Sequence, residues 1–417
     1  MNKLWRHRSI LGWLLYDVAS SGYALLVPGV AYAVYYRQVV CGGTTSCDAQ
    51  WAILTSLSLI GAGLLAPFLG AIADTGNLRY PIFALATGLC CLATSLLFWV
   101  EPGGWVLGGT AFILAQIGYI CAASLYDSYL PLLASGPRLG QLSGLGWGLG
   151  YLGGLICFFI AYGWLQGGLV GSNLPTYRLT FLLVSGFYAL MALPSLAWLP
   201  RRSQQPTSYD LRNLIPTAYG QVLNTLKGWR DLPVVFQFLV GYYLLSDGTV
   251  TVHSFIAIYL QTQFALEVGQ ILQLTLLFNA IAIPTTLAVG LLHHRWSALT
   301  LLKGILVLWV GLLLLIVFGT HPLTPLLVAI GLGVVSGSTQ SLCRGLFAQL
   351  IPHHRTSELF GFHALVGRIS ATLGPLIFGL TSALSGNQRL AMFLLLPFFL
   401  VGGWVLLRTP KSRPLPL

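Results

Sequence analysis

The sequence predicts an all-α polytopic membrane protein with twelve transmembrane helices in two pseudo-symmetric halves of six. The chain of 417 residues is 56% hydrophobic and only 7% charged, with a mean hydropathy of +0.80. A soluble protein would be about 25% charged. The apolar runs continue for about 20 residues, the length of a spanning helix. These runs are helices, because barrel strands would show short alternating segments.

The spans follow from the apolar runs in chain order. The first, residues 10–37, comes after a basic N-terminus like that of a signal peptide. This run is too long for a signal peptide and lacks a small-residue cleavage site, so we expect a retained helix. The other predicted spans are residues 50–73, 80–99, 105–133, 140–166, 177–199, 232–260, 268–292, 299–319, 322–350, 358–384 and 389–408.

One long polar stretch, residues 200–231, separates the two sets of six spans. Within it, apolar residues from Leu211 to Leu226 recur at helical spacing, which predicts an amphipathic helix on the membrane surface. The predicted parts are therefore an N-terminal half at 1–199, a cytoplasmic linker at 200–231 and a C-terminal half at 232–417.

The net charge of +11 reports topology rather than nucleic-acid binding. Most of the 21 Lys and Arg residues fall before the first span, in the even-numbered loops, in the linker and in the tail. Cytoplasmic loops carry such an excess of basic residues, so both termini are expected in the cytoplasm.

The two halves repeat each other. Asp17 in the first span matches Asp247 in the seventh, and Asp127 in the fourth matches Arg344 in the tenth. The spacing between Asp127 and Arg344 also brings Gly144 onto Gly361 and Tyr151 onto Arg368. A constant spacing through two helices and a loop indicates duplication, and transporters often bind their substrate at the interface of such repeats.

A set of charged residues deep inside the predicted spans directs the search for a site: Asp17, Asp127, Asp247, Arg344 and Arg368. A charge at membrane depth is costly, faces a bundle interior or water, and marks substrate or proton pathways. The predicted substrate-binding residues are Asp17, Ser20, Tyr23, Tyr126, Asp247, Thr251, Gln340 and Arg344. The predicted proton-coupling residues are Asp127, Asp17, His253 and His363. The alternative for each aspartate is a structural role, and for Arg344 a permanent pairing with Asp127.

Twelve helices in two sets of six resemble the major facilitator superfamily. The loop at 70–79 resembles the signature that this superfamily carries between its second and third helices, with Asp74 its best-preserved element. The basic residue that usually follows the aspartate is Thr75 here, and the usual downstream glycine is Asn77.

A narrower resemblance is to the autophagy-associated vacuolar amino-acid effluxers and their bacterial relatives. It rests on residues 13–23, 144–154, 340–352 and 358–361. The resemblance implies the major facilitator fold and amino-acid transport, and we expect a bacterial inner membrane. The chain departs from the pattern at Val18, where the branch favours tryptophan.

A glycine-rich pattern lies in the fifth span. Gly148, Gly150 and Gly153 match a dinucleotide fingerprint, but that motif needs a strand, a turn and a helix. Gly146, Gly150 and Gly154 instead form a stripe that permits close helix packing. The predicted gating and structural residues are Asp74, Arg79, Gly146, Gly150, Gly154, Tyr151, Glu358 and Arg368.

Seven cysteines are present. Cys41 and Cys47 lie in the first outward loop and form either a disulfide or two free thiols, depending on the compartment. The paired histidines at 293–294 and 353–354 are interpreted as interfacial anchors, and we expect no metal and no cofactor.

The function predicted is secondary active transport of a small polar solute, amino acids first, by alternating access with proton coupling. The alternatives are transport of sugars, organic anions or drugs, and a non-transporting receptor or scaffold whose buried charges stabilise the fold. A membrane-embedded enzyme is the other class to consider, but we find no nucleophile and base at matching depth in the spans that would indicate one. The expected partners are the solute, protons and the lipid bilayer, without nucleic acid, and the expected state is a monomer.

Overall fold

A computed structural model describes residues 3–44, 46–201 and 211–409. Within those ranges every regular element is a helix and there is no strand, so the predicted all-α class is confirmed. Eleven helical stretches of the described chain are long and apolar enough to cross a membrane. The remaining predicted span corresponds to α10 (Pro233–Phe264), which has 32 residues but a more polar composition around Ser246 and Asp247.

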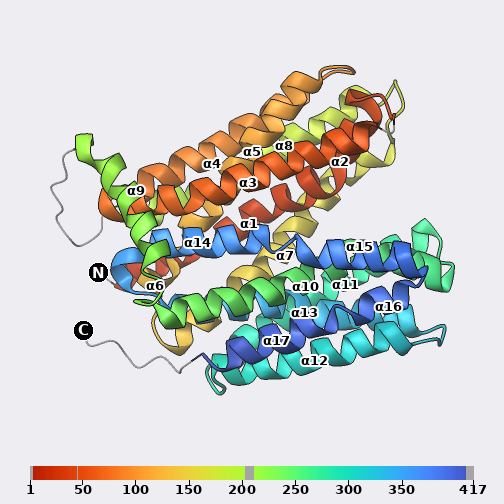
Figure 1. The fold of residues 1–417 in the computed structure, drawn as a ribbon. Coiled ribbons are helices and arrows are strands. Elements are labelled where there is room, and N and C mark those ends of the chain that lie inside the picture. Colours follow the sequence, from red (N-terminus) through yellow and green to blue (C-terminus); the bar gives the residue numbers. More distant parts are fainter. Residues whose placement is uncertain (1–2, 45, 202–210, 410–417) are drawn as a thin grey trace. The chain divides into compact units, whose positions relative to one another are not determined.

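The helices form two compact units. Unit 1 comprises residues up to Leu133, then Leu149–Asn224 and His353–Leu365. Its first span is built from α1 (Lys3–Leu25), η1 (Leu26–Val30), α2 (Ala31–Tyr35) and η2 (Tyr36–Val40). The rest of its helices are α3 (Ser46–Thr75), α4 (Arg79–Leu96), η3 (Leu97–Trp99), α5 (Trp105–Asp127), α6 (Leu130–Leu133), α8 (Leu174–Trp198) and most of α9 (Leu211–Lys227) (Figure 1).

Unit 2 comprises Ala134–Gly148, Thr225–Pro352 and Val366–Leu417. Its helices are α10, α11 (Val268–Leu292), α12 (Ala298–Phe318), α13 (Thr324–Leu350), α15 (Leu373–Ser385), α16 (Gln388–Phe393) and α17 (Leu396–Leu407). The short η4 (His353–Arg355) belongs to unit 1, whereas α7 (Pro137–Gln166) and α14 (Thr356–Ile369) each pass from one unit to the other.

The compact units therefore differ from the halves of the sequence by one exchange. The start of α7 belongs to unit 2, and the start of α14 belongs to unit 1. The spacing that relates Asp127 to Arg344 carries residues 134–148 onto 351–365, so the exchanged segments are repeat mates. The predicted boundaries 1–199, 200–231 and 232–417 stay a prediction, and α9 lies inside the predicted linker.

Side-chain exposure follows the periodicity of a helix in lipid. On α4, Leu85, Leu89, Leu92 and Leu96 recur at helical spacing and are all exposed. On the same helix Phe83, Thr87 and Cys90 are buried. An apolar face that stays exposed suits acyl chains, because lipid tails solvate leucine as well as the protein interior does.

The turn between α3 and α4 explains one departure from the superfamily signature. Asn77 adopts a positive φ of 55°, a left-handed conformation that favours glycine. Asparagine is among the residues that tolerate this conformation best. The turn therefore keeps its backbone geometry although the usual glycine is absent.

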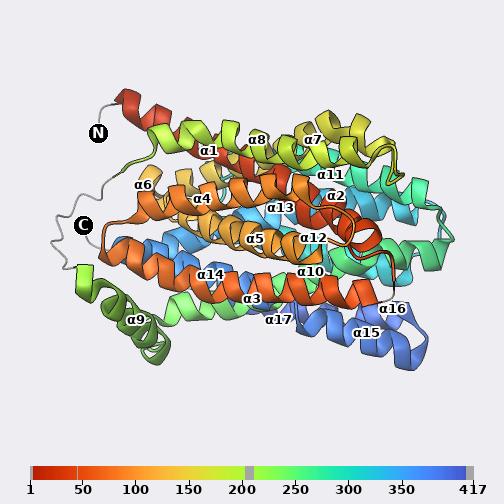
Figure 2. The same cartoon turned by 90° about the horizontal axis from the view of Figure 1, so that it is seen from above.

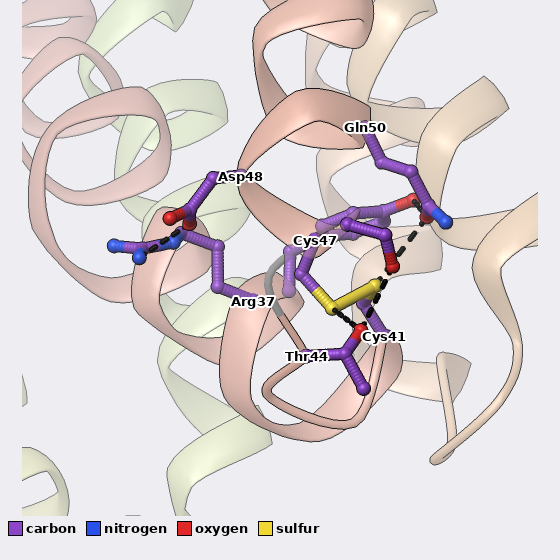
Figure 3. Close-up of a disulfide and its surroundings, with 8 residues drawn as sticks. Arg37, Cys41, Thr44, Cys47, Asp48 and Gln50 are labelled. Carbon is purple, nitrogen blue, oxygen red and sulfur yellow. Dashed lines mark hydrogen bonds and ion pairs between the residues drawn. A yellow bond between two sulfur atoms is a disulfide. The ribbon is translucent and has the colours of Figure 1, made fainter.

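A disulfide joins Cys41 to Cys47, with 5.6 Å between the two Cα atoms (Figure 3). It ties the end of η2 to the start of α3, where Arg37 also forms an ion pair with Asp48. The other five cysteines are free. The disulfide, one of the two alternatives left by the sequence, is the one that forms.

This pairing predicts the number of reactive thiols. Alkylation of the denatured protein without reductant should modify the five free cysteines, and reduction beforehand should raise the number to all seven. The Cys41→Ser variant should expose one thiol more than the wild type without reductant. Intact-mass spectrometry makes the count, and seven labels on the unreduced wild type would contradict the disulfide.

Candidate functional site

A cluster of polar side chains links the end of α3 and the start of α4 to the start of α14, all within unit 1. The Arg79 guanidinium donates to Asp74 Oδ1 at 3.0 Å and to Thr356 Oγ1 at 2.6 Å. Its Nε donates to Ser357 Oγ at 2.8 Å. Asp74 Oδ2 accepts the backbone N–H of Glu358 at 2.9 Å. The carboxylate therefore binds both a guanidinium and a helix N-terminus, two partners that favour its charged form.

Glu358 extends this cluster to the linker helix. Its carboxylate is fully buried and accepts two hydrogen bonds of 3.0 Å from Arg355. It also accepts a short hydrogen bond from the amide of Gln221 on α9, and the carbonyl of that amide accepts from Thr75 Oγ1 at 2.9 Å. α9 lies beside the end of α3 in Figure 2. We call Asp74, Arg79, Gln221, Ser357 and Glu358 the polar clasp.

Glycines bring the backbones of α3 and α14 together beneath the polar clasp. A Cβ added at Gly361 would lie 2.4 Å from Pro67 Cα, and one added at Gly70 would lie 2.2 Å from the Ser357 carbonyl oxygen. Neither position has room for a methyl group. This close approach lets Asp74 reach the first N–H groups of α14.

Unit 2 repeats this packing between α7 and α11. A Cβ at Gly144 would lie 2.4 Å from Gly290 Cα, and one at Gly140 would lie within 2.4 Å of the ring of His293. Gly144 and Gly361 are the repeat mates found in the sequence. His293 is buried, and its Nε2 has no hydrogen-bond partner among the described residues. Burial lowers the pKa of His293 to about 4.

The second half of α7 packs on α1 within unit 1, as the glycine stripe predicts. Gly150 lies opposite Ser21 and Asp17, and Gly153 lies against the backbone of Val18, with no room for a side chain. Gly154 makes an ordinary van der Waals contact with Ser21, and Gly146 is buried. Val18 is also the position where the family pattern favours tryptophan, and here its backbone touches Gly153.

Arg344 on α13 is almost fully buried, at 5% exposed, and is held by α7 within unit 2. Its Nε donates to Ser143 Oγ at 2.9 Å, and its Nη2 donates to the Ser143 carbonyl oxygen at 2.9 Å. The guanidinium carbon also lies 5.6 Å from the centre of the Trp147 ring, a cation–π contact. Neither Ser143 nor Trp147 was among the predicted site residues.

Asp247 caps a broken helix. The chain leaves helical conformation between α14 and α15, at residues 370–372. Oδ1 of Asp247 accepts the backbone N–H of Gly374, the second residue of α15, at 2.9 Å. The side chain is fully buried, and its Oδ2 has no partner in the described residues. A carboxylate at a helix N-terminus stabilises the unsatisfied N–H groups and the positive end of the dipole.

The sequence held a signal for this break. Pro375 lies in the first turn of α15, where proline is tolerated because its missing N–H needs no partner. A proline inside an apolar run indicates that a helix ends or kinks just before it. The predicted single span 358–384 corresponds to two helices that Figure 1 draws in succession.

The predicted tyrosines form an aromatic core in unit 1. Tyr126 stacks on Trp13 and on Tyr16, with ring centroids 4.6 and 4.8 Å apart. Tyr16 shares hydrogen bonds with Thr87 and Tyr188. Tyr23 is fully buried and donates to Gln116 at 3.0 Å. Tyr23 and Tyr126 thus lie inside the packing of unit 1.

The other predicted residues occupy varied environments. Ser20 and Thr251 are buried and donate to the backbone carbonyls of Asp17 and Asp247 in their own helices. Gln340 accepts from Tyr242 at 3.3 Å. His253 is half-buried and shares a 2.9 Å hydrogen bond with Ser336, and His363 is buried against Phe360. Asp17, Asp127, Tyr151 and Arg368 are half-buried.

Comparison with known proteins identifies the family to which this chain belongs. A family model described as "Vacuole effluxer Atg22 like" matches residues 39–414. The chain belongs to this family. It is 24% identical to the uncharacterized MFS-type transporter YxiO of Bacillus subtilis, with 96% of this chain and 94% of that protein covered. It is also 24% identical to autophagy-related protein 22 of Yarrowia lipolytica, over 86% of this chain and 75% of that protein.

Solved structures give the same fold. The proton:xylose symporter XylE has a TM-score of 0.73 at 13% identity, over 97% of this chain and 95% of its own. The human organic anion transporter MFSD10 has a TM-score of 0.72 at 16% identity, over 96% and 98%. At such identities the likeness establishes the fold alone. Together with the family, it makes this chain a multi-pass membrane transporter of the major facilitator type, not an enzyme.

The capping role of Asp247 predicts different effects for two substitutions. Asp247→Asn keeps an oxygen for the Gly374 N–H and should retain most of the stability. Asp247→Ala leaves the N-terminus of α15 uncapped and should cost about 1–2 kcal/mol. Thermal unfolding in detergent measures the difference. An Asn variant as unstable as the Ala variant would contradict the cap.

The burial of His293 predicts an acid-sensitive stability. The unfolded chain binds a proton near the ordinary pKa of about 6.5, whereas the folded chain binds it only near 4. Stability from this residue is therefore complete above pH 6.5 and is lost as the pH falls, by about 1–2 kcal/mol at pH 5. Between pH 7 and pH 5, the melting temperature of the His293→Gln variant should fall less than that of the wild type.

The neighbouring residue supplies a matched control for that experiment. His294 is exposed and differs from His293 by one position. His294→Gln should keep the wild-type dependence of melting temperature on pH. Equal acid sensitivity in the wild type and both variants would remove His293 as the cause.

Proposed function

We propose that this transporter carries a small polar solute, with amino acids first, by alternating access and couples that movement to protons. The observation that supports this most is the pair of half-buried carboxylates, Asp17 and Asp127, inside spans of unit 1. Ionisable groups at membrane depth mark substrate or proton pathways. Membership of the effluxer family supports the solute class.

Asp127 has a position suited to coupling. It is the last residue of α5, and the next residue, Ser128, contacts the polar clasp. The Ser128 carbonyl oxygen accepts from Arg79 at 3.3 Å, and its hydroxyl accepts from Ser357 at 3.2 Å. A proton that binds or leaves Asp127 changes the charge directly beside these bonds. This gives protonation a short physical route to the clasp.

The polar clasp is the gate in this proposal. It joins α3 and α4 to α14, which come from opposite halves of the sequence but belong to one compact unit. Alternating access moves one repeat against the other. Such a movement must break the Asp74 and Arg79 contacts with α14, and water must then solvate those charges. The clasp therefore sets part of the barrier between the two access states.

Orientation and assembly complete the proposal. The basic residues before the first span and in the even-numbered loops favour cytoplasmic termini. The Cys41–Cys47 disulfide then lies outside, where an oxidising compartment preserves it. We propose a monomer in a bacterial inner membrane.

Reconstitution into liposomes tests this function. Purified protein should exchange labelled neutral amino acids between the two sides of the membrane and accumulate them when a pH gradient is imposed. In the Asp127→Asn variant, gradient-driven accumulation should fall at least about 10-fold below that of the wild type, because a neutral amide cannot carry the proton. Exchange without a gradient should continue.

Asp231→Asn is the matched control, since Asp231 is exposed and lies outside the spans. It should accumulate solute at the wild-type rate. Accumulation by Asp127→Asn at the wild-type rate would reject the coupling role. Failure of the wild type to exchange any amino acid would reject the solute class.

A further inference from the structure

Arg368 is a charged residue in the middle of a span, and it has no partner in the part of the chain that the structure describes. It lies one residue before the end of α14, about 22 Å along a helical span that begins at His353. The side chain is half-buried. Among the described residues, no hydrogen bond, ion pair or ring contact involves its guanidinium. A guanidinium keeps its charge in proteins, so this position exposes an unneutralised cation at membrane depth.

Other carboxylates do not meet this need. Asp247 is the acidic residue of α10, in the same unit, and its Oδ1 caps α15 while its side chain is fully buried. The carboxylates of Asp48, Asp74, Glu101 and Glu358 form ion pairs with Arg37, Arg79, Arg178 and Arg355. An unpaired charge in a span is costly unless water or a ligand of opposite charge reaches it. An anion that reached the exposed part of Arg368 would therefore neutralise its charge.

Arg344, another arginine deep in a span of unit 2, provides a contrast. Arg344 is 5% exposed, and its guanidinium donates to Ser143 and faces the ring of Trp147. A solute would have to displace those contacts to reach it. Arg368 has no such contacts to displace. Between Arg344 and Arg368, Arg368 is therefore the guanidinium more available to a ligand.

Polar, uncharged groups pack against the residue that precedes Arg368. A Cβ at Gly367 would lie 3.2 Å from the Tyr242 hydroxyl oxygen, and that hydroxyl donates to Gln340 Oε1. The break at residues 370–372 follows two positions after Arg368. A guanidinium binds the two oxygens of a carboxylate in parallel, so a carboxylate is a suitable anion for Arg368.

We propose that Arg368 binds the carboxylate of the transported solute. This inference rests on the proposed function and narrows its substrate class to solutes that carry a carboxylate. It also gives the two halves different tasks. The repeat mate of Arg368 is Tyr151, so only the second half supplies this charge.

Ligand-induced thermal shifts test the site independently of transport. The probes are neutral amino acids, their amides, which lack the carboxylate, and a set of simple mono- and dicarboxylates. The wild type should be stabilised by carboxylates and not by the matched amides. Arg368→Gln should lose this preference, with the concentration for half-maximal shift rising about 10- to 100-fold. Arg368→Lys should recover part of it, because lysine keeps the charge but not the planar pair of donors.

Arg389→Gln is the matched control, because Arg389 is a half-buried arginine of the same unit that donates to Gln263. It should keep the preference of the wild type. The melting temperature of each variant without ligand reports whether it has folded, and the Lys variant remains informative if the Gln variant has not.

Two results would overturn the inference: stabilisation of the wild type by amides and carboxylates alike, or a carboxylate preference that survives in Arg368→Gln. Amino-acid exchange that does not depend on Arg368 rejects the site and leaves the proposed function standing. Arg368-dependent binding of dicarboxylates without amino acids rejects the solute class and leaves the site standing.

Discussion

The close packing of α14 on α3 is the constraint on which the polar clasp depends. Gly361 and Gly70 let the two backbones approach closely, so the start of α14 comes within hydrogen-bonding distance of Asp74. In a membrane, helices associate through van der Waals packing and hydrogen bonds, because lipid offers no hydrophobic drive to bring them together. The glycines provide the close van der Waals packing, and Asp74 and Arg79 provide the hydrogen bonds. Either alone would hold the helices less firmly.

The repeat extends this constraint to the other unit but changes its chemistry. Gly144 and Gly290 reproduce the glycine contact between α7 and α11. His293 lies beside that contact, buried against Gly140, and its Nε2 has no partner among the described residues. One contact is thus held by ionic hydrogen bonds and its counterpart by packing of a neutral ring. This difference makes the two contacts respond differently to pH.

Much of the fold was predictable from the sequence, because span length and apolarity are local properties. The repeat also matches Gly144 to Gly361, and both glycines lie at close helix contacts in the structure. The partners of the buried charges were not predictable. Whether Arg344 meets Ser143 or Asp247 caps α15 depends on helices more than 100 residues apart in the sequence. A single sequence contains no pairing information at that distance. Tyr23 and Tyr126 carry both a hydroxyl and a ring, and composition alone does not decide between a binding surface and a core.

The matched aspartates Asp17 and Asp247 have different environments, and the difference coincides with one proline. In the second half, Pro375 accompanies a break in the helix, and the new N-terminus of α15 takes the Asp247 carboxylate as its cap. The corresponding part of the first half has Phe158 in place of that proline, and α7 continues without a break. Asp17 consequently faces an intact helix at Gly150, where there is no N-terminus to cap. The two aspartates are matched in the sequence, but only Asp247 meets a new helix N-terminus. The break in the helix thus gives Asp247 a capping role for which α7 offers Asp17 no counterpart.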